Sequence, residues 1–364
     1  MNSPWPMMET LFHAPAPRKP ARRWFNAFLC MLLLALPMTA CAAGWWCLWI
    51  SWLPDCGTAP PALLTEVTAF GTNPGKLRMF IYLPANLGPS RPLVIALHGC
   101  KQQASSYDDE PGWIKFAQRH RFALLLPQQQ QANNASKCFN WFQAGDNERD
   151  QGEALSIRQM IDKVKAQAGS DPQKVYVTGL SAGGGMASVM LAVYPELFAG
   201  GAIVAGIPYK CASNVNQALN QCGVSLFGQL APMKHMTPAQ WGALVRNASG
   251  HHGPFPRVAI WHGASDTTVN PQDQKELVAQ WTNVLGIDQI ADAEDTINGH
   301  PHKEYKNSAG RVLVETVLVN GMGHGTAIDP GPADQQCGIG APFILDVGVC
   351  ASFYIVKFWG LDTS

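Results

Sequence analysis

Charge is scarce in this chain, and the two signs balance. Only 14% of its 364 residues are charged, against about 25% in an average protein, and 26 basic residues offset 26 acidic ones. A net charge of zero offers no electrostatic attraction for nucleic acid, so DNA or RNA binding is excluded. A hydrophobic content of 47% excludes a disordered chain. The length suits one large α/β domain or two smaller ones.

Long uncharged stretches are also rare. The longest, residues 24–54, follows a basic cluster at residues 18–23. A protein with several membrane spans would need several stretches of this length, so that class is excluded. The apolar run at 28–36 and the small residues that end at Ala42 predict an export signal cleaved after that alanine. Two alternatives stay open: acylation of Cys41 in a weak lipobox, or a retained membrane anchor as the chain's only membrane contact. Without residues 1–42 the chain has 22 Lys+Arg and 25 Asp+Glu, so the body is mildly acidic.

Cysteine usage agrees with export. Of ten cysteines, two fall in the signal segment and eight follow it. An even number is typical of a disulfide-bonded exported protein, although scattered buried thiols remain the alternative. The eight permit 105 pairings. Paired C-x-x-C motifs and paired histidines at ligand spacing are missing, so we expect neither a metal nor a cofactor.

Alternating strand and helix patterns begin after residue 62. Residues 43–62 are expected to be a linker or arm, and residues 63–364 the catalytic domain. Continuous apolar runs predict buried parallel strands between helices, which gives an α/β fold with a mostly parallel, helix-covered sheet. The alternation of strand and helix patterns weakens at 208–256, which predicts a cap-like insertion. The polar tract 128–134 is expected to be an exposed loop. The expected strands are 65–70, 77–83, 92–97, 122–126, 174–178, 201–205, 257–261 and 312–318, and the expected helices are 112–120, 152–168, 182–194 and 272–285.

One motif in this pattern predicts nucleophilic catalysis. Residues 179–183 match G-x-S-x-G between a strand and a helix, the setting of a nucleophile elbow. Its glycines permit a sharp turn that presents the Ser181 hydroxyl, and the N–H of Ala182 can stabilise an oxyanion. A serine nucleophile needs a base, and the base needs an orienting acid. Asp266 follows a strand end, and His324 lies later in a glycine-flanked loop, which is the chain order of such hydrolases.

Two other histidines compete for the role of base. His98 and His262 also follow strand ends. We expect both to be structural, because His98 precedes the region where an oxyanion loop is expected and His262 precedes the acid Asp266.

Several segments together resemble the extracellular polyhydroxybutyrate (PHB) depolymerase family of esterases. The resemblance covers residues 63–361, although single motifs are shared with feruloyl and acetylxylan esterases. The segments are LHGCKQQ at 97–103, CFNWF at 138–142, DQGE at 150–153, GLSAGG at 179–184, WHG-x-x-D at 261–266, GMGHG at 321–325 and the C-terminal pattern from 337 to 361.

This resemblance implies an α/β-hydrolase with Ser181 as nucleophile, Asp266 as orienting acid and His324 as base. It also implies an oxyanion hole formed by the backbone N–H groups of Cys100 and Ala182. The implied disulfides are Cys100–Cys138, Cys211–Cys222 and Cys337–Cys350, with Cys47–Cys56 as a further pairing. Secreted members continue into a linker and a polymer-binding domain, whereas this sequence ends at Ser364, so oligomers and short-chain esters are expected substrates beside the polymer.

The expected function is therefore hydrolysis of polyhydroxybutyrate or 3-hydroxybutyrate oligomers through an acyl-enzyme. Trp141, Phe142 and Trp261 are candidates for an apolar wall of the substrate cleft. The enzyme is expected outside the cytoplasm, secreted or periplasmic, or anchored by its N-terminal segment. The alternatives are a feruloyl or acetylxylan esterase, a peptidase with the same triad, or a non-catalytic envelope protein on a hydrolase scaffold.

Overall fold

The structure, a computed structural model, describes residues 63–85, 87–225 and 230–362. The predicted export segment, the linker at 43–62 and the expected Cys47–Cys56 pairing lie outside the described residues. Of the helices in the described ranges, none has the length and hydrophobicity that a membrane crossing requires.

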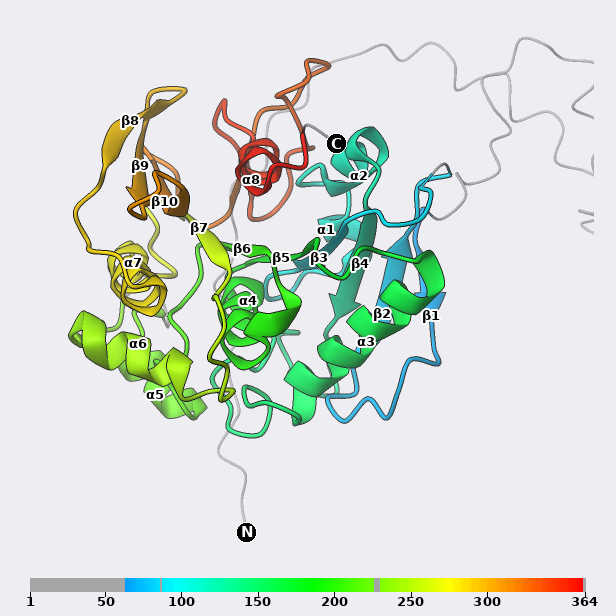
Figure 1. Ribbon diagram of the computed structural model, residues 1–364, viewed down its shortest axis with the longest axis horizontal. Coiled ribbons are helices and arrows are strands. Elements are labelled where there is room, and N and C mark those ends of the chain that lie inside the picture. The colour runs from blue at the N-terminus through cyan, green and yellow to red at the C-terminus, as the bar shows by residue number, and fades with distance from the viewer. Residues whose placement is uncertain (1–62, 86, 226–229, 363–364) are drawn as a thin grey trace, which may run out of the picture. The chain divides into compact units, whose positions relative to one another are not determined.

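A ten-stranded sheet forms the centre of the described part (Figure 1). Its strands are β1 (Thr65–Val67), β2 (Arg78–Tyr82), β3 (Leu93–Leu97), β4 (Ala123–Gln128), β5 (Val175–Leu180), β6 (Gly200–Val204), β7 (Arg257–Gly263), β8 (Ala293–Ile297), β9 (His300–Lys306) and β10 (Val312–Val319). They are arranged in the order β1-β2-β4-β3-β5-β6-β7-β10-β9-β8. From β4 to β10 neighbouring strands run parallel, and antiparallel strands extend both edges. β11 (Thr326–Ile328) and β12 (Ile344–Asp346) form a separate parallel pair.

Helices cover both faces of the sheet, as the expected α/β architecture requires. They are α1 (Ala104–Tyr107), α2 (Trp113–His120), α3 (Gly152–Ala168), α4 (Ala182–Val193), the 3-10 helix η1 (Pro195–Leu197), α5 (Val215–Gln221), α6 (Pro238–Arg246), α7 (Gln272–Leu285) and α8 (Ala351–Trp359). The buried side chains of α3, α4 and α7 share one apolar cluster, and those of α1, α2 and α8 share the other. Because both faces are covered, a central strand such as β3 is buried along its whole length.

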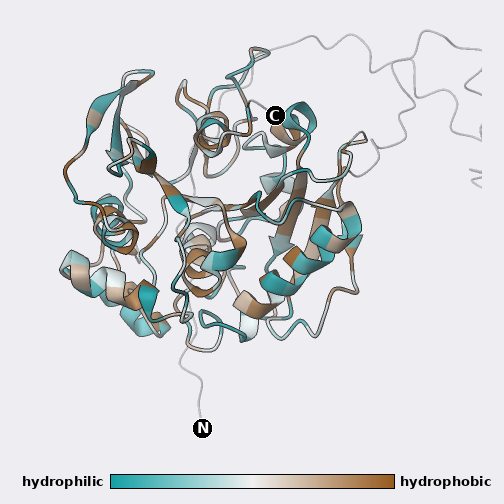
Figure 2. Cartoon of the chain, viewed as in Figure 1, coloured by the Kyte–Doolittle hydropathy of each residue, from teal (hydrophilic) through white to brown (hydrophobic). Residues whose placement is uncertain are grey.

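The β8–β9 hairpin is an extension that sequence patterns did not predict. Its segments AEDTI and HPHKEYK lack the apolar runs of the central strands. Figure 2 shows the hairpin largely in the hydrophilic colour, while the strands at the middle of the sheet are mostly hydrophobic. A polar edge pair is held chiefly by its backbone hydrogen bonds to β10, which hydrophobic periodicity does not report.

The segment 208–256 is only in part a cap. It contains α5, which borders the cavity described below, and α6, which packs against α7. Trp241 of α6 has no exposed surface and joins the main apolar cluster, because the helix buries one face against α7. The second half of the expected insertion is therefore an ordinary part of the core.

Candidate active site

The sharp turn between β5 and α4 presents Ser181. Its backbone has φ 57° and ψ −119°, in a region that residues with side chains rarely adopt. The turn needs glycine on both sides because the chain packs closely there. A Cβ at Gly183 would lie 2.2 Å from the Leu97 carbonyl oxygen, and one at Gly179 would lie 2.3 Å from that of Gly183. β5 extends to Leu180, so the first half of the motif is strand and Ser181 stands at the corner.

Asp266 lies in the loop after β7, and its side chain is fully buried. One carboxylate oxygen, Oδ1, accepts the backbone N–H groups of Thr268 (2.8 Å) and Val269 (2.9 Å). The other, Oδ2, accepts Nδ1 of His324 at 2.7 Å. Burial alone would raise the pKa of Asp266, but the neighbouring His262 and His324 outweigh it and hold that pKa well below its ordinary value. The carboxylate therefore stays ionised through the neutral and mildly acidic range.

The contact with Asp266 also decides the tautomer of His324. An ionised carboxylate can only accept, so Nδ1 carries the proton and Nε2 presents a lone pair. His324 lies in the loop after β10, and the edge of its ring meets Phe343 with ring centroids 6.0 Å apart. In the described part of the chain the Ser181 hydroxyl makes no hydrogen bond to this ring, although both residues line one cavity. Such bonds are often long until substrate binds.

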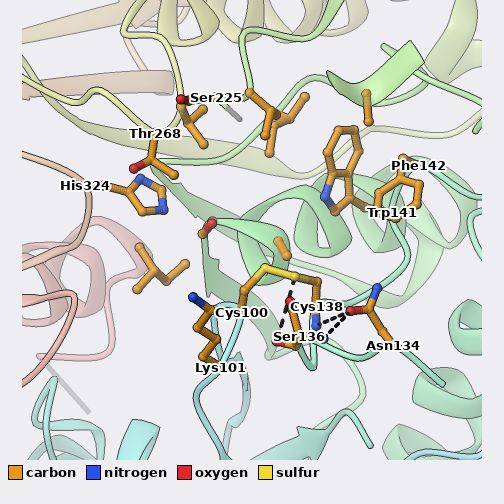
Figure 3. Close-up of a pocket in the computed structure, with 18 of the residues that line it drawn as sticks. Cys100, Lys101, Asn134, Ser136, Cys138, Trp141, Phe142, Ser225, Thr268 and His324 are labelled. Atoms are coloured by element: carbon orange, nitrogen blue, oxygen red, sulfur yellow. Dashed lines mark hydrogen bonds between the residues drawn. A yellow bond between two sulfur atoms is a disulfide. The ribbon is translucent and has the colours of Figure 1, made fainter. Parts of the chain in front are cut away.

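The cavity has a volume of about 470 Å³. Figure 3 shows His324 on the side opposite Trp141 and Phe142, with the Cys100–Cys138 disulfide between them. Apart from His324 and Lys101, the described side chains that line the cavity are uncharged. A buried serine, a histidine hydrogen-bonded to a carboxylate and an uncharged cavity wall together suit attack on a neutral carbonyl compound.

Comparison with known proteins shows the family of the chain. The family model of esterase PHB depolymerases matches residues 77–298. The poly(3-hydroxyalkanoate) depolymerase C of Paucimonas lemoignei is 52% identical over 299 residues, which are 82% of this chain and 70% of that protein. The chain belongs to the esterase PHB depolymerase family. It is a carboxylic ester hydrolase with an α/β-hydrolase fold.

More distant relatives share the fold and extend to other esters. Feruloyl esterase B of Talaromyces stipitatus is 31% identical over 281 residues, 76% of this chain and 75% of that protein. The solved acetyl xylan esterase of Aspergillus awamori superposes with a TM-score of 0.65 at 24% identity and covers 82% of this chain and 99% of its own.

The predicted site residues of this esterase come together with one exception. Ser181, His324, Cys100, Ala182, Trp141 and Phe142 all line the cavity, and Asp266 lies behind His324. Trp261 does not. It is 1% exposed and belongs to the cluster of the opposite face, where its ring packs near Tyr354 of α8. Alternate residues of β7 point to opposite faces, and Trp261 points away from the face that α4 and α7 cover.

A disulfide and a glutamine side chain hold the loop that follows β3. The Cys100–Cys138 disulfide ties this loop to the segment that carries Trp141. The Gly99 N–H donates to Oε1 of Gln102 at 2.8 Å, so the loop backbone has a defined course past Ser181. Gln102 is part of the LHGCKQQ motif at 97–103, and the sequence alone predicted no role for it. The implied Cys211–Cys222 and Cys337–Cys350 pairings are also confirmed.

A buried polar network that the sequence patterns did not predict surrounds Glu153. Glu153, 1% exposed, accepts the Asn140 N–H at 2.8 Å and the side-chain amide of Gln129. Burial, assisted by repulsion from Asp146, raises the pKa of Glu153 to about 8. Gln129 has no exposed surface, so the expectation that residues 128–134 form an exposed loop is wrong at this position. The only available signal was the DQGE motif at 150–153, which contains Glu153.

The competing histidines have structural roles, as expected. His98 is 1% exposed: Nε2 accepts the Gln129 N–H (3.1 Å) and Nδ1 donates to the Gly99 carbonyl (2.7 Å). Burial lowers the pKa of His98 to about 4, which keeps it neutral. His262 is fully buried, and its Nε2 lies 3.0 Å from the Val269 carbonyl and 3.4 Å from Asp266. It braces the Asp266 loop.

No cluster of three or more potential ligands that could hold a metal occurs among the described residues.

Proposed function

We propose that this esterase hydrolyses poly(3-hydroxyalkanoates) and their oligomers, with Ser181 as nucleophile, His324 as base and Asp266 as orienting acid. The observation that carries the catalytic assignment is the 2.7 Å contact between His324 and Asp266 beside a cavity that also holds Ser181. The substrate assignment rests on the 52% identical depolymerase, which is named for a poly(3-hydroxyalkanoate).

Acylation follows from the tautomer of His324. Its Nε2 lone pair removes the Ser181 proton while the serine oxygen attacks the ester carbonyl carbon. The carbonyl π-electron pair moves to its oxygen, and the backbone N–H groups of Cys100 and Ala182 donate hydrogen bonds to the resulting oxyanion. The Ala182 N–H stands at the start of α4, where helix N–H groups have no intrahelical acceptor. Collapse of the intermediate breaks the ester C–O bond, and protonated His324 gives its proton to the leaving alkoxide.

Deacylation repeats these steps with water. His324 removes a proton from water, the hydroxide adds to the acyl carbon, and departure of Ser181 returns the free acid and the resting enzyme. Asp266 stabilises the imidazolium in both halves because its carboxylate is ionised and already aligned. The uncharged walls keep the effective dielectric constant low, which strengthens the hydrogen bonds from the two N–H groups to the oxyanion.

The cavity favours a short aliphatic ester, and an adjoining cleft favours a second candidate. A polar cleft of about 620 Å³ shares Asn134, Ser136, Phe142 and Val215 with the cavity and adds Asp146 and Asn140. An acyl group on a carbohydrate would place its hydroxyl groups against such side chains. A feruloyl or acetyl esterase activity is therefore the alternative, in line with the 31% identical feruloyl esterase.

Export is part of the proposal. Disulfides persist in oxidising compartments, and the described domain has three. A polymer that lies outside the cell can be reached only by an exported enzyme, so we infer that the reaction takes place outside the cytoplasm.

A substrate panel tests the proposal. Purified enzyme is incubated with 3-hydroxybutyrate oligomers, amorphous polymer granules, methyl ferulate and acetylated xylan, and a fluorophosphonate probe reports the nucleophile. We expect labelling at Ser181 and preferential hydrolysis of the oligomers and granules. Preference for ferulate or acetylxylan would establish the second candidate, and labelling of another serine would refute the triad.

A further inference from the structure

One charged side chain stands at an otherwise uncharged cavity. Lys101 follows Cys100 directly, and its exposed side chain contributes to the cavity lining. In Figure 3 it extends from the Cys100 end of the cavity, and its nitrogen lies at the tip directed toward the centre. Within the described part of the chain, Lys101 forms no ion pair with a carboxylate. Its ammonium is thus available to a ligand.

The backbone of Lys101 is held on both sides. Its N–H donates to the Ser136 carbonyl at 2.7 Å, and the preceding residue is tied to Cys138 by a disulfide. The residue has φ 66°, a left-handed conformation that a lysine adopts at some cost. The stem of the side chain therefore starts from a defined point beside the proposed oxyanion donor, while its ammonium remains free to move.

The products of the proposed reaction explain what an ammonium could recognise there. Cleavage of a 3-hydroxyacid oligomer leaves the free carboxylate end on the departing alcohol. When the bond nearest that end is cut, two carbons separate the carboxylate from the scissile ester oxygen. If the scissile carbonyl oxygen lies at the Cys100 N–H, the long side chain of the next residue can reach that carboxylate.

We propose that Lys101 binds the terminal carboxylate of short 3-hydroxyacid oligomers and so directs cleavage to the ester bond nearest the carboxyl end. This inference rests on the proposed function and adds the position of the cut. Because Lys101 is exposed, the attraction is that of a solvent-screened ion pair, and no carboxylate among the described lining residues competes for its ammonium. Polymer interiors have no such carboxylate, so the lysine distinguishes oligomer ends from bonds within a long chain.

The test compares a 3-hydroxybutyrate dimer with its methyl ester, which differ only in the terminal charge. The quantity measured is the ratio of kcat/KM for the free acid to kcat/KM for the methyl ester. We expect K101M to lower this ratio about twofold to fivefold, mostly through KM for the free acid. K101R should retain most of the ratio because the charge remains. Higher ionic strength should lower the ratio of the unaltered enzyme but not that of K101M.

Lys137 provides the matched control. It lies on the neighbouring segment with a similar left-handed backbone, φ 52°, but is not among the lining residues of the cavity. K137M should leave the ratio at the value of the unaltered enzyme. A ratio that K101M does not change, or that K137M lowers equally, would overturn the role of Lys101.

A p-nitrophenyl butyrate assay separates this failure from failure of the proposed function. Hydrolysis of that ester without hydrolysis of either dimer would overturn the proposed substrate, and the inference with it. Hydrolysis of both dimers at a K101M-insensitive ratio would overturn the inference alone.

Discussion

The cavity that Ser181 and His324 line and the β8–β9 edge of the sheet use charge in opposite ways. Around the cavity, Lys101 and His324 are the described lining residues that can carry a charge. At the edge, Lys303 pairs with Glu294 (2.7 Å), Lys306 pairs with Glu304 (2.8 Å), and His302 lies between Asp295 and Glu315. The edge therefore holds several paired charges, whereas the wall of the cavity is almost uncharged.

Each arrangement has a physical reason. A cavity with few charges of its own strengthens the hydrogen bonds that the two backbone N–H groups donate to an oxyanion. The outermost strand β8 has unpaired backbone groups on one side, and its exposed residues Glu294 and Asp295 discourage pairing with another sheet. We expect substitutions at the cavity to change activity far more than stability, and substitutions at the edge to do the reverse.

The largest effect is expected at Ser181. S181A should lower kcat by about 10⁴-fold or more, because the covalent intermediate cannot form. The free energy of unfolding should change by less than about 1 kcal/mol, since the hydroxyl has no hydrogen-bond partner to lose among the residues that the structure describes. Steady-state kinetics and urea unfolding measure the two quantities. S265A, a change of an exposed serine next to Asp266, is the control and should alter neither.

Asp266 should rank second. D266N is expected to reduce kcat by about 10³–10⁴-fold, because an amide can donate to Nδ1 of His324 and favour the wrong tautomer. D162N, which breaks only the exposed pair with Arg158, serves for comparison and should cost less than about 0.5 kcal/mol with full activity. A D266N enzyme with near-normal turnover at neutral pH would contradict the assigned role.

Removal of a disulfide should affect both properties. The Cys100–Cys138 bridge closes a sequence separation of 38, and its loss by double alanine substitution should cost about 3–4 kcal/mol of stability. Because the bridge positions a proposed oxyanion donor, we also expect a lower kcat. Loss of Cys337–Cys350 should cost about 3 kcal/mol and change mainly KM, since its loop carries Phe343 of the cavity wall. Equal kcat in both variants would show that the first bridge is only structural.

The smallest effect, confined to stability, is expected at His302. Hydrogen bonding with Glu315 and the nearby Asp295 raises the pKa of His302 from 6.5 to about 9. A raised histidine pKa stabilises the fold fully below its unfolded value and loses this contribution as pH rises toward about 9. H302N should therefore cost about 1–2 kcal/mol at pH 6, after allowance for screening, and flatten the decline in stability between pH 6.5 and 9.

Thermal unfolding across this pH range measures the effect. K303M at the same edge is the comparison: it breaks the half-exposed pair with Glu294 and should cost under about 1 kcal/mol without changing the pH slope. A large loss of activity in H302N at 25 °C would remove the distinction between the two regions.

The parts of the fold that could be predicted are those that local patterns encode. The apolar run of β3 and the amphipathic helix α3 were predicted almost residue by residue, since burial on both faces or on one face leaves a direct trace. The polar strands β8 and β9 show no hydrophobic pattern from which they could be predicted. Gln129 was predicted to be exposed for a related reason. A polar side chain is normally solvated, but Glu153, 24 residues later in the sequence, supplies a buried hydrogen-bond partner.

The site divides in the same way. Glycine spacing and chain order predicted Ser181, Asp266 and His324 as a triad, because a tight turn and loops at strand ends have local requirements. The structure places Ser181 and His324 in one cavity and Asp266 in contact with His324. Trp141 and Phe142 do line the cavity, whereas Trp261 packs on the opposite face of β7. A strand buried on both sides shows no polar alternation, so its sequence could not reveal which face the tryptophan takes.

The sequence by itself determined the scarcity of charge, the order of the central strands and their main helices, and the family that motif and identity together establish. Only the tertiary structure decided where the few charges lie: paired along a polar edge, absent from most of the cavity wall, and present at its rim in Lys101. The reason is physical. Composition counts charges, but their energy depends on distance and burial, and these arise only when segments far apart in the chain meet.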